Sequence, residues 1–68
     1  MVKNLRLLRE EKGYSQQKLA EMINISQQAI FKYEKTDNEP DISTLIRLAE
    51  IFGVSVDYLI GNTDIREP

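Results

Sequence analysis

The sequence predicts an all-α fold, a compact domain of five short helices, and three observations support this prediction. The chain has 68 residues, which is enough for one hydrophobic core and too few for two. Apolar residues recur at helical spacing along most of its length. Four residues that commonly cap a helix start precede apolar segments: Ser15, Ser26, Asp41 and Ser55. Four residues that suit a left-handed backbone follow predicted helices: Gly13, Asn24, Gly53 and Gly61.

The first two helices are predicted on either side of a glycine turn. The first runs from about Lys3 to Lys12 and ends before Gly13. The second begins after Ser15, whose hydroxyl can accept a bond from a free backbone N–H group, and ends where Asn24 lets the chain reverse. The apolar residues that we expect to face the core are Val2, Leu5 and Leu8, then Leu19, Ala20, Ile23 and Ile25.

The third helix, about residues 26–35, has two different sides when residues are placed 100° apart. Its inner side is small and apolar, with Ser26, Ala29, Ile30 and Tyr33. Its outer side carries two amides, an aromatic ring and two ammonium groups, from Gln27, Gln28, Phe31, Lys32 and Lys35. Two short helices around a tight turn predict a helix-turn-helix, whose second helix can enter the DNA major groove.

The outer side of this helix has the chemistry that base recognition needs. Glutamine offers a donor and an acceptor together, which matches the N6/N7 edge of adenine, and lysine can donate to guanine or to phosphate. Phe31 could contact a thymine methyl group or a sugar, although an exposed aromatic can also mark a protein contact. A solvated helix face is the alternative. The capped helix and the Asn24 turn before it favour DNA contact.

A polar loop that ends at Pro40 separates these helices from a fourth helix, which begins after Asp41 and stops at Gly53. Its expected apolar stripe is Ile42, Leu45, Leu48, Ala49 and Phe52.

A short fifth helix, Val56 to Ile60, completes the predicted domain, which spans residues 1–61. Residues 62–68 are expected to be a frayed C-terminal tail or the start of a linker. Apolar side chains on and after the fifth helix could contact a second copy of the chain or cap the core of one copy: Val56, Tyr58 and Ile60, with Ile65 in the tail.

The composition argues against catalysis. The chain has no histidine and no cysteine, and its three glycines form no phosphate-binding loop. We therefore expect no enzymatic activity, no cofactor, no metal and no small-molecule ligand. No apolar run approaches the length of a membrane span, and the start is too charged for a signal peptide, so we expect a soluble, cytoplasmic protein with no membrane partner.

Charge is divided unequally along the chain. Residues 1–35 hold seven basic and four acidic side chains, a balance of +3, whereas residues 36–68 hold two basic and seven acidic ones, a balance of −5. The positive half contains the helix-turn-helix. This polarity can steer a duplex onto one side of the molecule although the net charge is −2.

An ordered set of residues between Leu5 and Gly61 carries a further signal. The set is Arg9, Gly13, Ser15-Gln16, Leu19-Ala20, Ile25-Ser26, Ala29-Ile30, Tyr33-Glu34, Pro40, Leu45, Leu48-Ala49, Phe52-Gly53-Val54-Ser55 and Leu59. In this order the chain resembles the Cro and phage-repressor family of helix-turn-helix proteins, also called Xre-type. The resemblance implies the compact five-helix fold of lambda-repressor-like DNA-binding domains, with the helix-turn-helix at helices two and three.

The resemblance also implies roles for individual residues. Base edges are expected to face Gln27, Gln28 and Lys32, with Phe31 beside them. The position of Gln16 usually contacts a phosphate in the family; apart from the resemblance, we also expect Lys18, Asn24 and Lys35 to contact phosphates. Arg9 and Glu34 match a pair that commonly links helix one to helix three, and the alternative for Glu34 is a solvated carboxylate.

Two departures from the family pattern lie beside the helix-turn-helix. Asn24 stands where many relatives have glycine, and the turn survives because asparagine tolerates that conformation. Thr36 stands where glycine is common, and the acidic loop after it puts phosphate contacts by that loop in doubt.

The expected function is sequence-specific binding of double-stranded DNA by a transcriptional repressor. The resemblance implies a two-fold homodimer on a palindromic operator, with half-sites about 34 Å apart. The alternative is a protein-interaction module that keeps the fold without specific DNA binding, which the acidic second half and Phe31 suggest.

Overall fold

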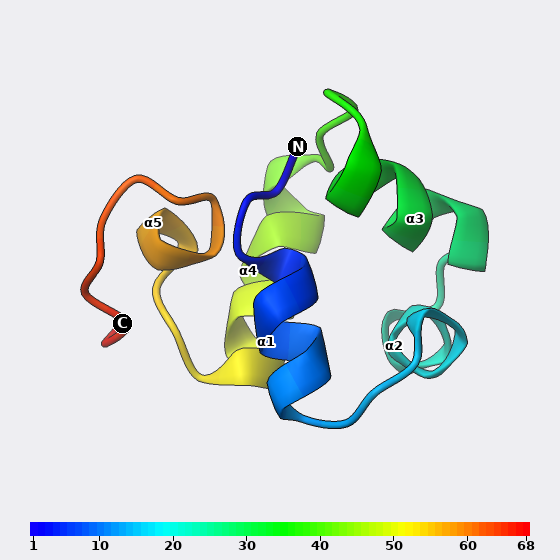
Figure 1. The fold of residues 1–68 in the computed structure, drawn as a ribbon, viewed down its shortest axis with the longest axis horizontal. Helices are drawn as coiled ribbons and strands as arrows, with labels where there is room; N and C mark the ends of the chain where they lie inside the picture. Colours follow the sequence, from blue (N-terminus) through cyan, green and yellow to red (C-terminus); the bar gives the residue numbers. More distant parts are fainter.

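The computed structural model describes all 68 residues and confirms an all-α fold of five helices. The helices are α1 (Leu5–Glu11), α2 (Gln16–Ile23), α3 (Gln27–Lys35), α4 (Ile42–Phe52) and α5 (Val56–Leu59). In Figure 1, α1 and α4 lie in the middle, α2 and α3 lie to one side, and α5 with the C-terminus lies to the other. None of the five is both long and apolar enough to cross a membrane.

Local capping explains where four of the helices begin. In each case the capping side chain accepts a hydrogen bond from the backbone N–H three residues later, as predicted for Ser15, Ser26, Asp41 and Ser55. Asn24 and Gly53 then end α2 and α4 in the left-handed conformation, with φ angles of 60° and 65°. Short-range hydrogen bonds therefore fix most of the helix boundaries.

The first helix is shorter than predicted, because the residues before Leu5 are used differently. The Val2 N–H donates to the carbonyl of Tyr33 at 2.8 Å, and the Asn4 N–H donates to the carbonyl of Leu59 at 3.0 Å. The Asn4 side chain also donates to the Tyr58 carbonyl at 2.7 Å. The N-terminal segment thus ties the end of α3 to α5 instead of adding a turn to α1.

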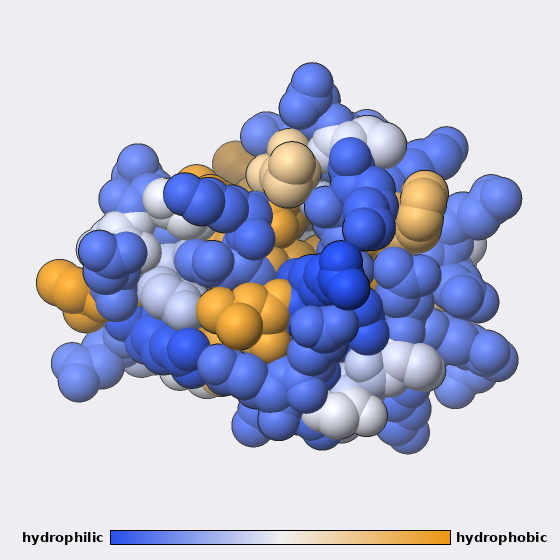
Figure 2. Space-filling model, in the orientation of Figure 1, coloured by the Kyte–Doolittle hydropathy of each residue, from blue (hydrophilic) through white to orange (hydrophobic).

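The core draws on every helix, and one residue of the predicted stripe lies outside it. Thirteen apolar residues are buried, among them Val2, Leu5 and Leu8 as predicted. Leu48, Ala49 and Phe52 are buried on α4 and Leu45 is half-buried, but Ile42 is 75% exposed. Ile42 opens α4 and lies about 70° around the helix from the middle of the buried side. Figure 2 shows a mostly hydrophilic surface with separate hydrophobic patches.

The C-terminal tail is folded back onto the domain and is not frayed. The Ser55 N–H donates to the Arg66 carbonyl at 2.8 Å. The Arg66 guanidinium donates to both carboxylate oxygens of Glu11, at 2.8 and 2.9 Å, and its carbon lies 5.0 Å from the centre of the Tyr58 ring. Arg66 and Glu11 lie 55 residues apart in the chain, so local sequence could not indicate their contact. The last helix ends at Leu59, one residue before the predicted Ile60.

Candidate nucleic-acid interface

The α2–turn–α3 unit is built by caps and by one left-handed residue. Ser15 Oγ accepts from the Lys18 N–H at 2.9 Å, and Ser26 Oγ accepts from the Ala29 N–H at 3.1 Å. Between them Asn24 adopts φ 60° and ψ 46°, which reverses the chain. The Ile25 N–H then donates back to the Ala20 carbonyl at 3.0 Å, which closes the turn. The two helices are therefore held at a fixed angle by their own connection.

The outer side of α3 is exposed to solvent. All five residues that the sequence places there are exposed, with Phe31 at 47%: Gln27, Gln28, Phe31, Lys32 and Lys35. Their amide and ammonium groups make no hydrogen bond or ion pair within the chain. On the inner side Ile30 and Glu34 are buried, and Ala29 and Tyr33 are half-buried. The donors and acceptors of the outer side are thus free to meet a partner.

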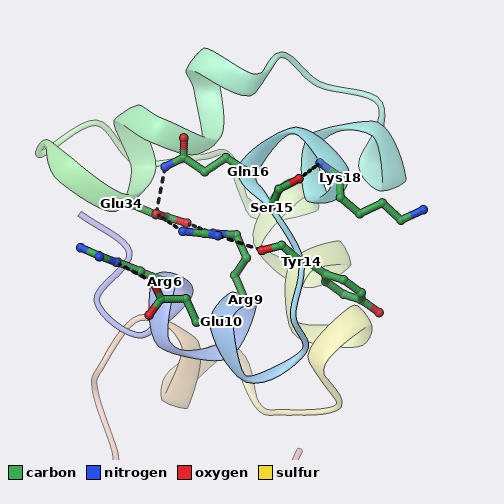
Figure 3. Close-up of polar contacts among 8 residues, drawn as sticks. All are labelled: Arg6, Arg9, Glu10, Tyr14, Ser15, Gln16, Lys18 and Glu34. Atoms are coloured by element: carbon green, nitrogen blue, oxygen red, sulfur yellow. Dashed lines mark hydrogen bonds and ion pairs between the residues drawn. The ribbon is translucent and has the colours of Figure 1, made fainter.

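A buried ion pair holds α3 against α1. Arg9 Nε donates to Glu34 Oε2 at 2.7 Å and Arg9 Nη2 donates to Glu34 Oε1 at 3.2 Å, a two-point contact (Figure 3). The Glu34 side chain is 0% exposed and that of Arg9 is 11% exposed. Hydrogen bonding to Glu34 raises the pKa of the Arg9 guanidinium above its ordinary value. The two-point contact between this guanidinium and Glu34 fixes the orientation of α3.

Two further groups complete this cluster. Gln16 Nε2 donates to Glu34 Oε1 at 3.2 Å, so the first residue of α2 also braces α3. Arg9 Nη1 donates to the Tyr14 carbonyl at 2.8 Å, which fixes the segment between α1 and α2 (Figure 3). No buried side-chain nitrogen or oxygen lacks a partner. Glu34 is therefore a structural anchor and not the solvated carboxylate that was its alternative.

The four expected phosphate contacts are spread over the unit. Lys18, Asn24 and Lys35 are exposed on α2, in the turn and at the end of α3, and Gln16 is half-buried. In Figure 3 the Lys18 side chain points away from the Arg9–Glu34 pair. One Gln16 N–H is used on Glu34, but an amide carries two, so the second can still donate outward.

Arg47 on α4 supports the turn, and the sequence did not reveal this. Its Nη2 donates to the Ile23 carbonyl at 2.7 Å, at the C-terminal end of α2. A cation at a helix C-terminus satisfies free carbonyls and opposes the negative end of the helix dipole. The only sequence signal was a basic residue off the apolar stripe of α4, which does not identify a partner 24 residues away.

The apolar candidates on α5 divide between core and surface. Tyr58 is 7% exposed and packs in the core, with its ring under Arg66. Because Tyr58 is covered, its burial favours a position in the core of one copy over contact with a second copy. Val56 is half-buried and Ile60 is exposed. They stand four residues apart, on one side of the short helix.

The sequence is similar to a known family and to curated proteins over nearly its whole length. A family model described as helix-turn-helix matches residues 5–59. The SPbeta prophage-derived HTH-type transcriptional regulator YonR of Bacillus subtilis is 46% identical over 59 residues, which cover 87% of this chain and 55% of that protein. The HTH-type transcriptional regulator ImmR of the same organism is 36% identical over 65 residues, 96% of this chain and 51% of that protein.

A third relative comes from another bacterium. The HTH-type transcriptional regulator RC0668 of Rickettsia conorii is 39% identical over 67 residues, 97% of this chain and 54% of that protein. The chain thus spans about half the length of the curated relatives that it matches.

Proposed function

The chain belongs to the Cro and phage-repressor (Xre-type) helix-turn-helix family, and from this premise we propose that it is a sequence-specific transcriptional repressor that binds double-stranded DNA. The observation that carries the proposal is the outer side of α3. Five side chains able to contact bases or phosphates are exposed there, while the opposite side is fixed by the buried Arg9–Glu34 pair. A helix presented in this way can enter the major groove as a rigid body.

We assign base recognition to Gln27, Gln28, Phe31 and Lys32. The glutamine amides can pair with adenine N6 and N7, Lys32 can donate to guanine O6 or N7, and the Phe31 ring can cover a thymine methyl group. The free amide and ammonium groups on α3 support the assignment, because no intramolecular bond has to break before DNA is bound.

Phosphate contacts are assigned to Gln16, Lys18, Asn24 and Lys35. These side chains lie at the start of α2, in the turn and at the end of α3, so they could position α3 on the duplex from both ends. The unpaired ammonium groups of Lys18 and Lys35 would add attraction that weakens with salt.

We further propose that two copies bind a palindromic operator, with half-sites about 34 Å apart. Val56 and Ile60 are the remaining candidates for contact between copies, since the Tyr58 side chain is buried. Repression requires no catalytic group, only stable occupancy of the operator.

Selection from random duplex DNA, at low and at physiological salt, tests the proposal. The wild-type chain is expected to enrich a two-fold-symmetric motif, and Gln28→Ala is expected to blur the motif at one position in each half-site. Gln17→Ala is the matched control, because Gln17 is exposed on α2 and its amide already donates to Glu21 at 3.3 Å. Failure of the wild type to enrich any sequence at either salt would refute specific DNA binding.

A further inference from the structure

We propose that the groove between α4 and α5 is a docking site for a cationic amphipathic helix of a partner protein, a role beyond DNA binding. The groove has a volume of about 440 Å³. Its apolar walls come from Ile46 and Ala49 on α4, from Val54 in the connection to α5, from Val56 at the start of α5, and from Pro68 in the tail. Ala49 and Val54 are buried, but Ile46 is 45% exposed and Val56 is half-buried, so these two leave apolar surface that a partner could cover.

The apolar surface continues along α4. Ile42 precedes Ile46 by one turn, and the two are 75% and 45% exposed. Glu50 follows one turn later on the same side and lines the groove. The three positions span about 12 Å at 1.5 Å per residue, which is two turns of a helix laid beside them. A partner helix with apolar residues at i, i+3, i+4 and i+7 has the matching spacing.

The negative charge around the groove favours a positively charged partner. Glu50 lines it, and the exposed acids Asp57 and Glu67 directly follow Val56 and precede Pro68. None of the three acids forms an ion pair, and no lysine or arginine lines the groove. The only two bases of residues 36–68 are engaged elsewhere, Arg47 on the Ile23 carbonyl and Arg66 on Glu11. Lysines or arginines flanking the apolar positions of a partner would therefore find carboxylates that have no cationic partner in the chain.

The same charges disfavour two other occupants. A second copy placed across a two-fold axis through the groove would bring Glu50 close to its own counterpart, and like charges oppose such contact. Of the two candidates for contact between copies, Val56 lines the groove, which leaves that contact to Ile60, which does not line it. Glu50, which lines the groove, likewise opposes the phosphates of DNA. The α5 side of the groove is also distant from the proposed DNA contacts, since α5 and the C-terminus lie on the opposite side of the molecule from α2 and α3 (Figure 1). A partner could therefore bind while α3 occupies DNA.

Titration with two synthetic helical peptides tests the proposal on the full chain. The first has leucines at i, i+3, i+4 and i+7 and lysines at the flanking positions; the second has glutamates in place of the lysines. In amide NMR spectra the lysine peptide is expected to shift signals of residues 42–56, and the glutamate peptide is expected to leave them unchanged. Shifts located elsewhere, or equal binding of both peptides, would overturn the proposal.

Matched variants separate the apolar and the charge contributions. Ile46→Ser is expected to weaken the lysine peptide by about tenfold or more. Leu7→Ser is its control, because Leu7 is also 45% exposed but lies on α1. Glu50→Gln is expected to weaken binding about two- to fivefold, as for one exposed ion pair, whereas Asp37→Asn, which removes the same charge from the loop after α3, has no effect.

Self-association is measured on the same proteins. Sedimentation of the wild type and of Ile46→Ser is expected to give the same oligomeric state. Loss of a dimer on Ile46→Ser, but not on Leu7→Ser, would show that the groove holds a second copy and would refute a cationic partner.

Discussion

Glu34 shows how one residue can fix the orientation of the proposed DNA-contact helix. Its carboxylate has no exposure to solvent, and its oxygens accept three hydrogen bonds, two from Arg9 and one from Gln16. A buried ion pair of this kind contributes little net stability over an apolar pair, but removal of one partner leaves an uncompensated charge. The cluster therefore sets the angle of α3. It lowers the stability of the fold mainly when one of its members is removed.

Arg9→Ala is expected to lower the free energy of unfolding by about 3–5 kcal/mol, because Glu34 would remain buried without its cation. A 68-residue domain has a total stability of about 3–10 kcal/mol, so this variant should be close to unfolding at room temperature. Arg6→Ala is the control, since the Arg6–Glu10 pair is more than half exposed and should cost less than about 1 kcal/mol. Urea denaturation followed by circular dichroism measures both, and equal losses would contradict the structural role of Glu34.

The two proposed classes of DNA contact predict different binding behaviour. Lys35→Ala is expected to weaken binding to every sequence and to reduce the slope of log K against log salt by about 1, because one phosphate contact is lost. Gln28→Ala is expected to cost about 1–3 kcal/mol on the selected operator and to leave that slope unchanged. Fluorescence anisotropy at several salt concentrations distinguishes them. A reduced slope for Gln28→Ala would reassign that residue to phosphate contact.

At the scale of the elements, the turn between α2 and α3 depends on a left-handed residue that is not glycine. Asn24 has a φ of 60°, and its N–H donates to the carbonyls of the last turn of α2. Such a conformation costs most side chains about 1–2 kcal/mol, and asparagine is less penalised. Asn24→Ala should therefore destabilise the domain by about 1 kcal/mol, or about 4–8 °C in Tm for a domain of this size.

Asn24→Gly is the matched replacement, because glycine adopts the same conformation without strain. Calorimetry is expected to give a Tm at or above that of the wild type for glycine and a lower Tm for alanine. Equal melting of the two variants would mean that the turn relaxes out of the left-handed region when the side chain changes.

The elements could be predicted from sequence because their signals are local. A cap and its N–H lie three residues apart, and a core stripe repeats within one helix, so Ser26 and Leu48 could both be identified. Ile42 was misplaced because spacing identifies a side of a helix but not whether a neighbour covers it. The partners of Arg47 and Arg66 lie 24 and 55 residues away in the chain, and no local pattern encodes such distances. The Arg9–Glu34 pair could be expected only through the family resemblance.

Across the whole molecule, both terminal segments of the chain are hydrogen-bonded to helices of the domain. The N-terminal segment bonds to the end of α3 and to α5, and the tail bonds to α1 and to the start of α5. Arg66 and Glu11 form the outermost of these links, with each side chain nearly half exposed. Hydrogen bonding from Arg66 lowers the pKa of the Glu11 carboxyl below its ordinary value of 4.5. The docked tail is therefore linked to pH.

The lowered pKa of Glu11 determines how docking of the tail depends on pH. A carboxyl whose pKa is lowered in the folded chain stabilises the fold above its ordinary pKa, and this contribution is lost as pH falls through the lowered value. The Ser55 N–H donates to the Arg66 carbonyl, so its NMR signal should report tail docking. We expect the signal to be constant at neutral pH and to move during acid titration with a midpoint below 4.5.

Two signals make that titration specific. In Glu11→Gln the Ser55 transition should disappear. The Thr44 N–H donates to Asp41, whose pKa is also lowered by hydrogen bonds from Thr44. Its signal should still move in this variant, because Asp41 is unchanged. Persistence of the Ser55 transition in Glu11→Gln would assign it to another carboxyl. A midpoint above 4.5 in the wild type would show that the Arg66–Glu11 link does not form in solution. Residues 62–68 would then be detached from the domain in solution.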